Sequence, residues 1–405
     1  MNALDAESQF DITVNGHLSL HGIDLIDTCS EWKTPLLVFD GDRLRGNFVR
    51  FRQAFEKYYS RTIVCYSIKT NSNLAICSLL QHVGAHAEVC SELDLYATSK
   101  AGFNPKQVVL DGPFKPESLL RTAVNKKISM INLECSTELE RLNMIAGEFG
   151  QDQAVGLRVN HSKPGFFKND PSSRFGFSIE ETYSILQRMA KYENLDIKGI
   201  MAHPYMGAAE MLMPFVKRVY EKLKIRFEFV NFGGGFHSGA NIEQIAKSIT
   251  DSIKQTLPQW EPTIVLEPGS FIANDAGIML LRVVHVKEAG GRKWVMVDGG
   301  VNVLPTPDEK RIPKIANHMN STPNELVNVV GPIPSPGDYI STETRLPEVQ
   351  EGDIIAVSNS GAYTLGYSSQ FLYPRPYAIM VTREKGITKI REKESFEDVL
   401  RMDRM

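Results

Sequence analysis

The segment Tyr66-Ser67-Ile68-Lys69-Thr70-Asn71 carries the clearest chemical signal of this chain. Lys69 follows the apolar run Ile63–Tyr66, and this pattern predicts an amine at the end of a buried strand. A buried lysine is costly unless its pKa is lowered or it is used covalently. A desolvated amine that attacks a carbonyl is the chemistry of Schiff-base enzymes. A lysine that reaches water along its apolar stem is the ordinary alternative, and this segment leaves both open.

Other apolar segments also end in polar residues or glycine. A glutamate before Pro268-Gly269 could hold a protonated ring nitrogen or could cap a helix. A glycine triplet could form a nest of amides for an anion or could be a flexible turn. A histidine could stack on a flat cofactor or could be structural. These residues are Glu88, Arg158, His203, Gly233, Gly234, Gly235 and Glu267. Lysine, glycines and glutamate together match the aldehyde, phosphate and pyridine nitrogen of pyridoxal 5′-phosphate.

Alternating apolar and helical segments must position these residues. We predict eight strands, nearly continuous in apolar residues, with helical stretches between them. The strands are Thr62–Lys69, Ala85–Val89, Val108–Gly112, Ile128–Glu134, Ala154–Asn160, Ile197–His203, Arg226–Gly233 and Thr263–Glu267. The fold class is therefore α/β, with a (β/α)₈ TIM barrel whose chemistry lies at the carboxyl ends of the strands. A doubly wound open sheet is the alternative, because periodicity does not reveal closure.

The two ends of the chain differ from the middle in their pattern of apolar and turn-forming residues. From about residue 279 onward, short β segments alternate with turn signals such as Asp298-Gly299-Gly300, and Phe10–Leu20 also has a β pattern. We therefore expect a cofactor-binding barrel over residues 40–278. Residues 1–39 and 279–405 should form a β-rich domain built from both ends of the chain.

Composition excludes several classes of protein. The net charge of -3 over 405 residues gives no basic field for nucleic acid. No apolar run reaches membrane-spanning length, so we do not expect a membrane protein. The polar amino-terminal segment lacks a signal-peptide pattern, so we do not expect a secreted protein. The five cysteines show no CxxC pairing. We expect reduced thiols, no metal site and a cytoplasmic location.

An ordered set of motifs resembles a known family, and it spans nearly the whole chain. The family is the barrel-type (fold type III) pyridoxal-phosphate-dependent amino-acid decarboxylases, which include diaminopimelate and ornithine decarboxylases. The motifs are Thr34–Asp40, Tyr66–Lys69, Ala87–Ser91, Ser173–Phe177, Gly233–Gly235, Glu267–Gly269, Asp298–Gly300 and Gly361–Tyr363.

The resemblance implies a role for each matched residue. Lys69 would carry the cofactor, His203 would stack on its ring, and Glu267 would hold the ring nitrogen. The glycine triplet and Tyr363 would hold the phosphate, with Arg158 and Glu88 nearby. The resemblance also implies a homodimer, in which the β-rich domain contributes to the partner's active site. The remaining cofactor contacts would come from Gly269 and Ser270.

The chain departs from the family in the substrate loop, Gly331–Asp338. The family's cysteine and acid are Pro334 and Ser335 here, whereas Asp338 is kept and could meet a substrate ammonium. The family's arginine after Glu-Pro-Gly is Ser270, which should weaken phosphate binding or leave space for substrate. Proline has no acidic proton, so another group must return the proton to the substrate.

We therefore expect a carboxy-lyase that removes the α-carboxylate of an amino acid. The lost cysteine leaves open a racemase or epimerase, or a decarboxylation-coupled transaminase or oxidase. A catalytically silent cofactor-binding protein is disfavoured, because Lys69 and Glu267 are both present. The segment Ser358–Tyr363 and the Tyr205/Gly207 spacing resemble a secondary-metabolite subgroup. Its substrates include amino acids attached to a carrier and siderophore precursors.

Overall fold

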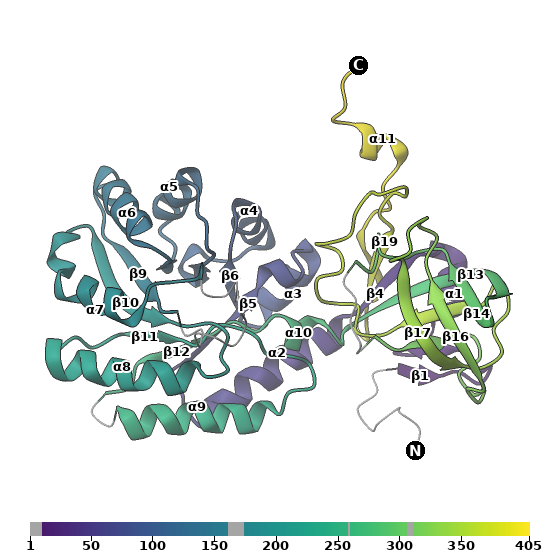
Figure 1. Ribbon diagram of the computed structural model, residues 1–405, viewed down its shortest axis with the longest axis horizontal. Coiled ribbons are helices and arrows are strands. Elements are labelled where there is room, and N and C mark those ends of the chain that lie inside the picture. The colour runs from purple at the N-terminus through teal and green to yellow at the C-terminus, as the bar shows by residue number, and fades with distance from the viewer. Residues whose placement is uncertain (1–9, 161–173, 258–259, 306–310) are drawn as a thin grey trace. The chain divides into compact units, whose positions relative to one another are not determined.

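The computed structural model describes residues 10–160, 174–257, 260–305 and 311–405 (Figure 1). The chain forms two compact units. One contains residues 1–46 and 273–405, and the other contains residues 47–272. The sequence-based division was placed at residues 40 and 278. Residues Gly277 and Ile278 belong to a strand of the first unit, since they pair with Phe39 and Val38.

The second unit is a closed barrel of eight parallel strands, with helices outside it (Figure 1). This confirms the predicted (β/α)₈ fold and excludes the open sheet, because β12 pairs with β5 and closes the ring. The strands are β5 (Thr62–Ser67), β6 (His86–Val89), β7 (Val108–Leu110), β8 (Met130–Leu133), β9 (Gln153–Arg158), β10 (Leu195–Met201), β11 (Phe229–Asn231) and β12 (Thr263–Leu266).

Helices follow the strands and bury their apolar faces against the barrel. None of the described helices is long and apolar enough to cross a membrane. Side-chain caps start several of them; Ser91, for example, accepts the amide of Asp94 at the start of α4. The helices are α2 (Gly41–Glu56), α3 (Leu74–His82), α4 (Glu92–Ala101), α5 (Glu117–Lys126), α6 (Ser136–Glu148), α7 (Ile179–Gln187), α8 (Ala208–Leu223), α9 (Ile242–Thr256) and α10 (Ser270–Ala273).

Each of the eight predicted strands has a counterpart, but most end before the predicted residue. The largest functional consequence concerns β5, which ends at Ser67 and passes into a 3-10 turn, Ile68–Thr70. The prediction that Lys69 ends the strand itself was therefore wrong. Ile68 is fully buried within the turn, so its apolar side chain extended the strand pattern in the sequence.

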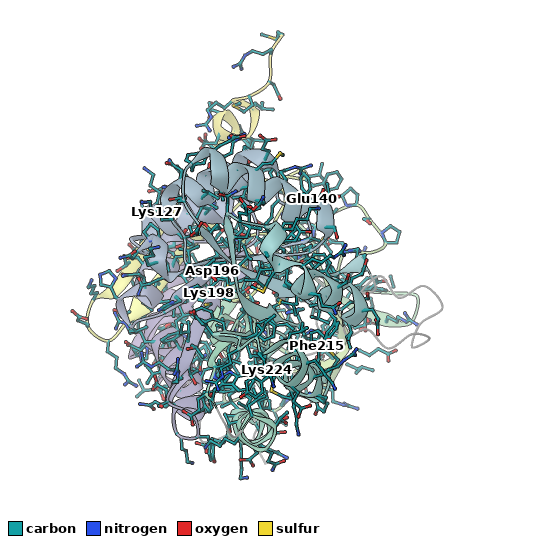
Figure 2. The ribbon with its side chains drawn as sticks, turned by 90° about the vertical axis from the view of Figure 1, so that its left-hand side faces the viewer. Lys127, Glu140, Asp196, Lys198, Phe215 and Lys224 are labelled. Atoms are coloured by element: carbon teal, nitrogen blue, oxygen red, sulfur yellow. The ribbon has the colours of Figure 1, made fainter. Side chains whose placement is uncertain are left out.

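The amino-terminal side of the barrel carries exposed charges (Figure 2). Lys198 of β10 places Nζ 3.2 Å from Asp196 Oδ2 and 3.2 Å from Glu228 Oε1. Exposed ion pairs of this kind contribute little to stability.

The first unit is rich in β structure and joins both ends of the chain. In its larger sheet, β4 from the amino-terminal part lies between β13 and β19 from the carboxyl-terminal part. Its core contains Leu36, Val38, Leu280 and Ile379. The strands are β1 (Phe10–Ile12), β2 (Leu18–Leu20), β3 (Ile23–Asp24), β4 (Leu36–Asp40), β13 (Gly277–Ala289), β14 (Arg292–Val297), β15 (Pro313–Ile315), β16 (Glu325–Val330), β17 (Tyr339–Leu346), β18 (Ile354–Val357), β19 (Tyr377–Thr382) and β20 (Gly386–Arg391), with helices α1 (Leu25–Trp32) and α11 (Phe396–Leu400).

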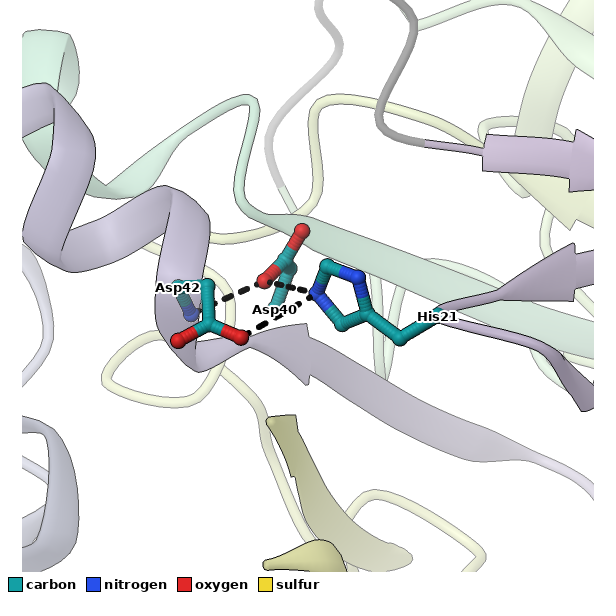
Figure 3. Close-up of side chains that lie close together, drawn as sticks. All are labelled: His21, Asp40 and Asp42. Atoms are coloured by element: carbon teal, nitrogen blue, oxygen red, sulfur yellow. Dashed lines mark hydrogen bonds and ion pairs between the residues drawn. The ribbon is translucent and has the colours of Figure 1, made fainter. Parts of the chain in front are cut away.

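A histidine and two aspartates meet where β4 passes into α2 (Figure 3). Asp40 Oδ1 accepts the amides of Asp42 and Arg43 at 2.9 and 3.0 Å, and so caps the helix. His21 Nε2 lies 2.9 Å from the same oxygen and 3.5 Å from Asp42 Oδ2. Asp42 Oδ2 also accepts the amide of Arg383 at 2.8 Å. These partners give the cluster a structural role at the helix start.

Candidate active site

Lys69 and Glu88 form the centre of the site at the carboxyl ends of β5 and β6. Lys69 Nζ lies 2.7 Å from Glu88 Oε1 and 2.6 Å from Oε2. The Lys69 side chain keeps 42% of its surface exposed, whereas Glu88 keeps 1%. The turn Ile68–Thr70 therefore aims the amine at a buried carboxylate and leaves it open to an incoming molecule.

The pair sets the protonation of both groups. Burial disfavours the Lys69 charge, but the charge and hydrogen bonds of Glu88 overcome this effect and raise the pKa of the amine well above its usual range. Burial also works against the Glu88 charge, and Lys69 reverses it, which lowers the pKa of that carboxyl. Without a cofactor, Lys69 is thus an ammonium. It must lose a proton before it can attack a carbonyl.

Two neighbours, Ser67 and Cys90, complete this group, and no role was predicted for either of them. Ser67 Oγ donates to Glu88 Oε2 at 2.6 Å and accepts from Lys69 Nζ at 2.9 Å. Cys90 Sγ donates to Glu88 Oε1 at 2.6 Å and lies 3.5 Å from Lys69 Nζ. Burial and then Glu88 raise the pKa of the thiol, so Cys90 stays protonated. Their positions beside strand ends are the signal that could have identified them.

The glycine loop and His203 form the opposite wall. Gly233 donates its amide to Asn231 Oδ1 at 2.8 Å, and Gly234 donates to His203 Nδ1 at 3.0 Å. Two of the three amides expected to hold an anion therefore have protein acceptors. The amides of Gly235 and Ser270 donate to no acceptor among the described residues, so they are the better candidates for a phosphate.

Glu267 lies at the end of β12, buried and held in place from two sides. Its amide donates to the Gly233 carbonyl at 2.9 Å, and its Oε1 accepts from Asn231 Nδ2 at 2.6 Å. Burial raises the pKa of the Glu267 carboxyl well above its usual range, and the neighbouring charges of Asp111 and Glu88 raise it further. Such a carboxyl can give a proton to, or share one with, a basic nitrogen.

Arg158 ends β9 and is held by a buried acid. Its Nη1 donates to Glu134 Oε1 at 2.5 Å, and its guanidinium lies 4.6 Å from the Phe175 ring centre. Glu134 Oε2 also accepts the amide of Gly176 at 2.8 Å. The predicted motif Ser173–Phe177 is thus tied to this strand end, except for Ser173, which lies outside the described residues. Arg158 remains a proposed neighbour of the cofactor.

The other predicted site residues belong to the first unit. Tyr363 has a positive φ of 55° and stacks on Tyr367 with ring centres 5.9 Å apart. Pro334 and Ser335 are exposed in the loop 331–338. Asp338 is 3% exposed and accepts the amides of Val301 and Ile333, both at 2.7 Å. This carboxylate thus joins the loop to Val301 through backbone amides, whereas the sequence analysis suggests that it meets a substrate ammonium.

The barrel residues fit pyridoxal phosphate by two observations. A Cβ on Gly234 would lie 2.6 Å from the Glu267 carbonyl, and a Cβ on Gly269 would lie 2.0 Å from Thr70 Oγ1. These glycines therefore let the backbone pass close to the strand ends that bear Lys69 and Glu267. The chemical groups also match the cofactor. They are the amine of Lys69, the Glu267 carboxyl with its raised pKa, and the amides of Gly235 and Ser270.

Comparison with known proteins decides the family. Residues 44–274 match the family model described as pyridoxal-dependent decarboxylase, pyridoxal binding domain. The chain belongs to this family.

Full-length relatives agree with this membership. A diaminopimelate decarboxylase from Methanothermobacter thermautotrophicus is 34% identical, with 96% of this chain and 97% of that protein covered. One from Aquifex aeolicus is 30% identical, with 95% of each covered. The crystal structure of the Methanocaldococcus jannaschii enzyme has a TM-score of 0.90 at 25% identity, with 98% of each chain covered. That enzyme has also been solved with L-lysine.

The protein is therefore a pyridoxal-phosphate-dependent amino-acid decarboxylase, a carboxy-lyase of the diaminopimelate and ornithine decarboxylase family. The relatives named here are decarboxylases, and nothing in them favours the racemase, transaminase or oxidase alternatives. The roles of Lys69, Glu267, His203 and the other site residues in this chain remain proposals.

Proposed function

We propose that Lys69 carries the cofactor and that the preferred substrate is an α-amino acid whose side chain does not end in an ammonium group. When bound, pyridoxal phosphate takes up the electron pair left on the α-carbon as carbon dioxide departs. Lys69 gives up its proton to bind the cofactor. Glu88 and Ser67, which contact the amine, orient it. Glu267 holds the ring nitrogen, and the amides of Gly235 and Ser270 bind the phosphate.

The substrate proposal depends mainly on the loop 331–338. Both oxygens of Asp338 accept backbone amides, one from Val301 and one from Ile333, and Ser335 replaces the family's acid, so the loop presents no carboxylate without hydrogen bonds. A cavity of about 660 Å³ beside the loop is lined mainly by apolar side chains, with His285, Lys287 and Asp338 also in its wall. A distal ammonium would meet only the Asp338 carboxylate, whose two oxygens already accept backbone amides, whereas a neutral group needs no counter-charge and an acidic group could pair with Lys287.

A side chain attached to a carrier is also neutral at its far end. The resemblance to the secondary-metabolite subgroup supports a carrier-bound or siderophore-precursor substrate. Diaminopimelate is the second candidate, because the relative with 34% identity acts on it by name. Its distal end carries both an ammonium and a carboxylate group.

A substrate panel separates these candidates. We would measure kcat/KM for glutamate, a side-chain thioester of glutamate as a carrier mimic, lysine, ornithine and diaminopimelate. We expect the neutral or acidic substrates to exceed lysine and ornithine by about tenfold or more, the discrimination that one unpaired buried charge produces. A preference for lysine or ornithine would refute the substrate proposal. A preference for diaminopimelate would establish the second candidate.

We also infer that two copies of the chain share each site, with the loop 331–338 of one copy serving the barrel of the other. Mixing Lys69→Ala with Asp338→Ala tests this inference, because each variant alone should be inactive. If sites are shared, a mixed dimer has one intact site and activity returns to about a quarter of wild type by random mixing. If each site is built within one chain, the mixture stays inactive.

A further inference from the structure

Asp111 is a buried carboxyl at the barrel's carboxyl end that the predicted site did not include. Its amide donates to the Val89 carbonyl at 2.8 Å, so the residue is held against β6 directly after β7 ends at Leu110. The side chain is 4% exposed. One oxygen from each of Glu88, Asp111 and Glu267 lies within 4.8 Å of the others. Three carboxyls therefore share one small buried volume.

Protein donors satisfy only one oxygen of Asp111. Asn132 Nδ2 donates to Oδ1 at 2.5 Å, whereas Oδ2 is buried and receives no hydrogen bond from the described residues. A buried carboxylate oxygen without a donor is costly. A proton on either acid would let Asp111 and Glu267 bond to each other, because a protonated carboxyl donates and an ionised one accepts.

The cations around this group are already paired. Lys69 contacts Glu88, and Arg158 contacts Glu134. Burial, followed by the Glu88 charge, raises the pKa of Asp111, and burial also raises the pKa of both neighbouring thiols. No described cation is therefore left to neutralise the second and third carboxyls. The titratable groups that face Asp111 or its carboxyl neighbours include Cys65, Lys69, Glu88, Cys90, Asp94, Arg158 and Glu267.

We propose that Asp111 and Glu267 share one proton at neutral pH, and that this acid pair keeps the cofactor's ring nitrogen protonated. The inference deepens the proposed function, since it rests on Glu267 as the partner of the nitrogen. As the pH rises, the acid pair releases the shared proton before the ring loses its own, and the pair then places a second negative charge beside the nitrogen. Asp111 is a positioning residue that acts through Glu267.

Asp111→Asn tests the claim with little change in shape. Its amide oxygen can still accept from Asn132 and its amide nitrogen can donate to Glu267, but it carries no proton to share. The readout is the ¹⁵N chemical shift of ring-labelled cofactor in the holoenzyme, followed against pH. We expect the variant to lose the ring proton at a pH at least one unit below wild type. Identical titrations would overturn the proposal.

Asp94→Asn is the matched control for this measurement. Asp94 is also a buried aspartate beside the site, but its carboxylate accepts the Cys90 amide at 3.0 Å and does not belong to the carboxyl group of three. We expect its ring titration to follow wild type within about 0.3 pH units, because the charge it removes lies outside the acid pair. An equal shift in both variants would show a general electrostatic effect and would overturn the specific role of Asp111.

The cofactor-free protein gives a second readout that needs no ring nitrogen. The pKa values of Asp111 and Glu267 are raised on folding, so their contribution to stability is present at low pH and is lost as the pH rises through the folded values. Asp111→Asn removes one such group. Its melting temperature relative to wild type should therefore rise between pH 5 and pH 9, by about 3 °C for one pKa unit. A constant difference would overturn the shared proton.

If Asp111→Asn does not fold, the melting measurement is made on Glu267→Gln instead. It removes the other member of the pair, and the same rise in relative melting temperature is expected. If wild type does not attach the cofactor at Lys69, the proposed function fails, but the melting measurement still decides whether the two acids share a proton.

Discussion

At the scale of single residues, the site is organised by one ammonium and three buried carboxyls. Glu88 forms an ion pair with the ammonium of Lys69. The thiol of Cys90 and the hydroxyl of Ser67 donate hydrogen bonds to the same carboxylate. Glu88 thus fixes the direction of the amine and also keeps it charged. Both of its oxygens lie within hydrogen-bond distance of Nζ, at 2.7 and 2.6 Å.

Glu88→Gln should lower the pKa of Lys69. Burial disfavours the ammonium, and the variant removes the charge that now outweighs burial. Each unit of decrease makes about ten times more free amine at neutral pH. Competitive acetylation of the cofactor-free protein, read by peptide mass, measures this pKa. Cys90→Ser is the control, since it keeps the charge and the hydrogen bond, and its Lys69 pKa should stay near wild type. An unchanged pKa in Glu88→Gln would contradict the pairing.

Sequence predicted some of these residues and missed others for physical reasons. Lys69, Glu88 and Glu267 were found because a charged residue after an apolar strand is unusual. Asp111 was missed because Asp-Gly after Val108–Leu110 has the pattern of an ordinary turn. Asp338 was assigned to substrate because sequence does not show that the amides of Val301 and Ile333 both donate to its carboxylate.

At the scale of elements, the glycines after β11 and β12 let the backbone segments at the strand ends pass close to one another. The apolar strands could be located from sequence, since buried parallel strands are nearly continuous in apolar residues. The ends of the strands could not be located, because Ile68 and Val159 are buried although they lie just after the last residues of β5 and β9. Whether the sheet closes depends on the pairing of β12 with β5, which no local pattern encodes.

Gly269→Ala should disturb the turn that carries Lys69. The added Cβ would lie 2.0 Å from Thr70 Oγ1 and 3.3 Å from Ser67 Cβ, so the turn must shift. We expect a loss of about 1–3 kcal/mol in the free energy of unfolding, as for overpacked cores, together with weaker cofactor binding. Urea unfolding and cofactor titration measure both.

Gly239→Ala is the matched control for this substitution. A Cβ there would lie 3.7 Å from His237 Nδ1, which is ordinary contact. We expect a change within about 0.5 kcal/mol and unchanged cofactor binding. Equal losses in both alanine variants would show that the close approach at Gly269 has no special role.

At the scale of the whole molecule, the chain joins a cofactor-binding barrel to a β-rich unit made from both ends. The alternation of strands and helices predicted the barrel, and the change in texture near residue 279 predicted the β-rich part. Sequence did not show that β4 pairs with β13 on one side and with β19 on the other, because these pairs join segments more than 200 residues apart. The shared-site inference belongs to this scale, and the mixed-variant experiment tests it.

The central claim is that this decarboxylase carries its cofactor on Lys69. Borohydride reduction of the purified holoenzyme, followed by peptide mass analysis, tests it most directly, because reduction fixes the cofactor to the amine that holds it. We predict the reduced cofactor on the peptide that contains Lys69, and no label in Lys69→Ala. Label on another lysine of the wild-type protein, or retention of label in the variant, would contradict the account.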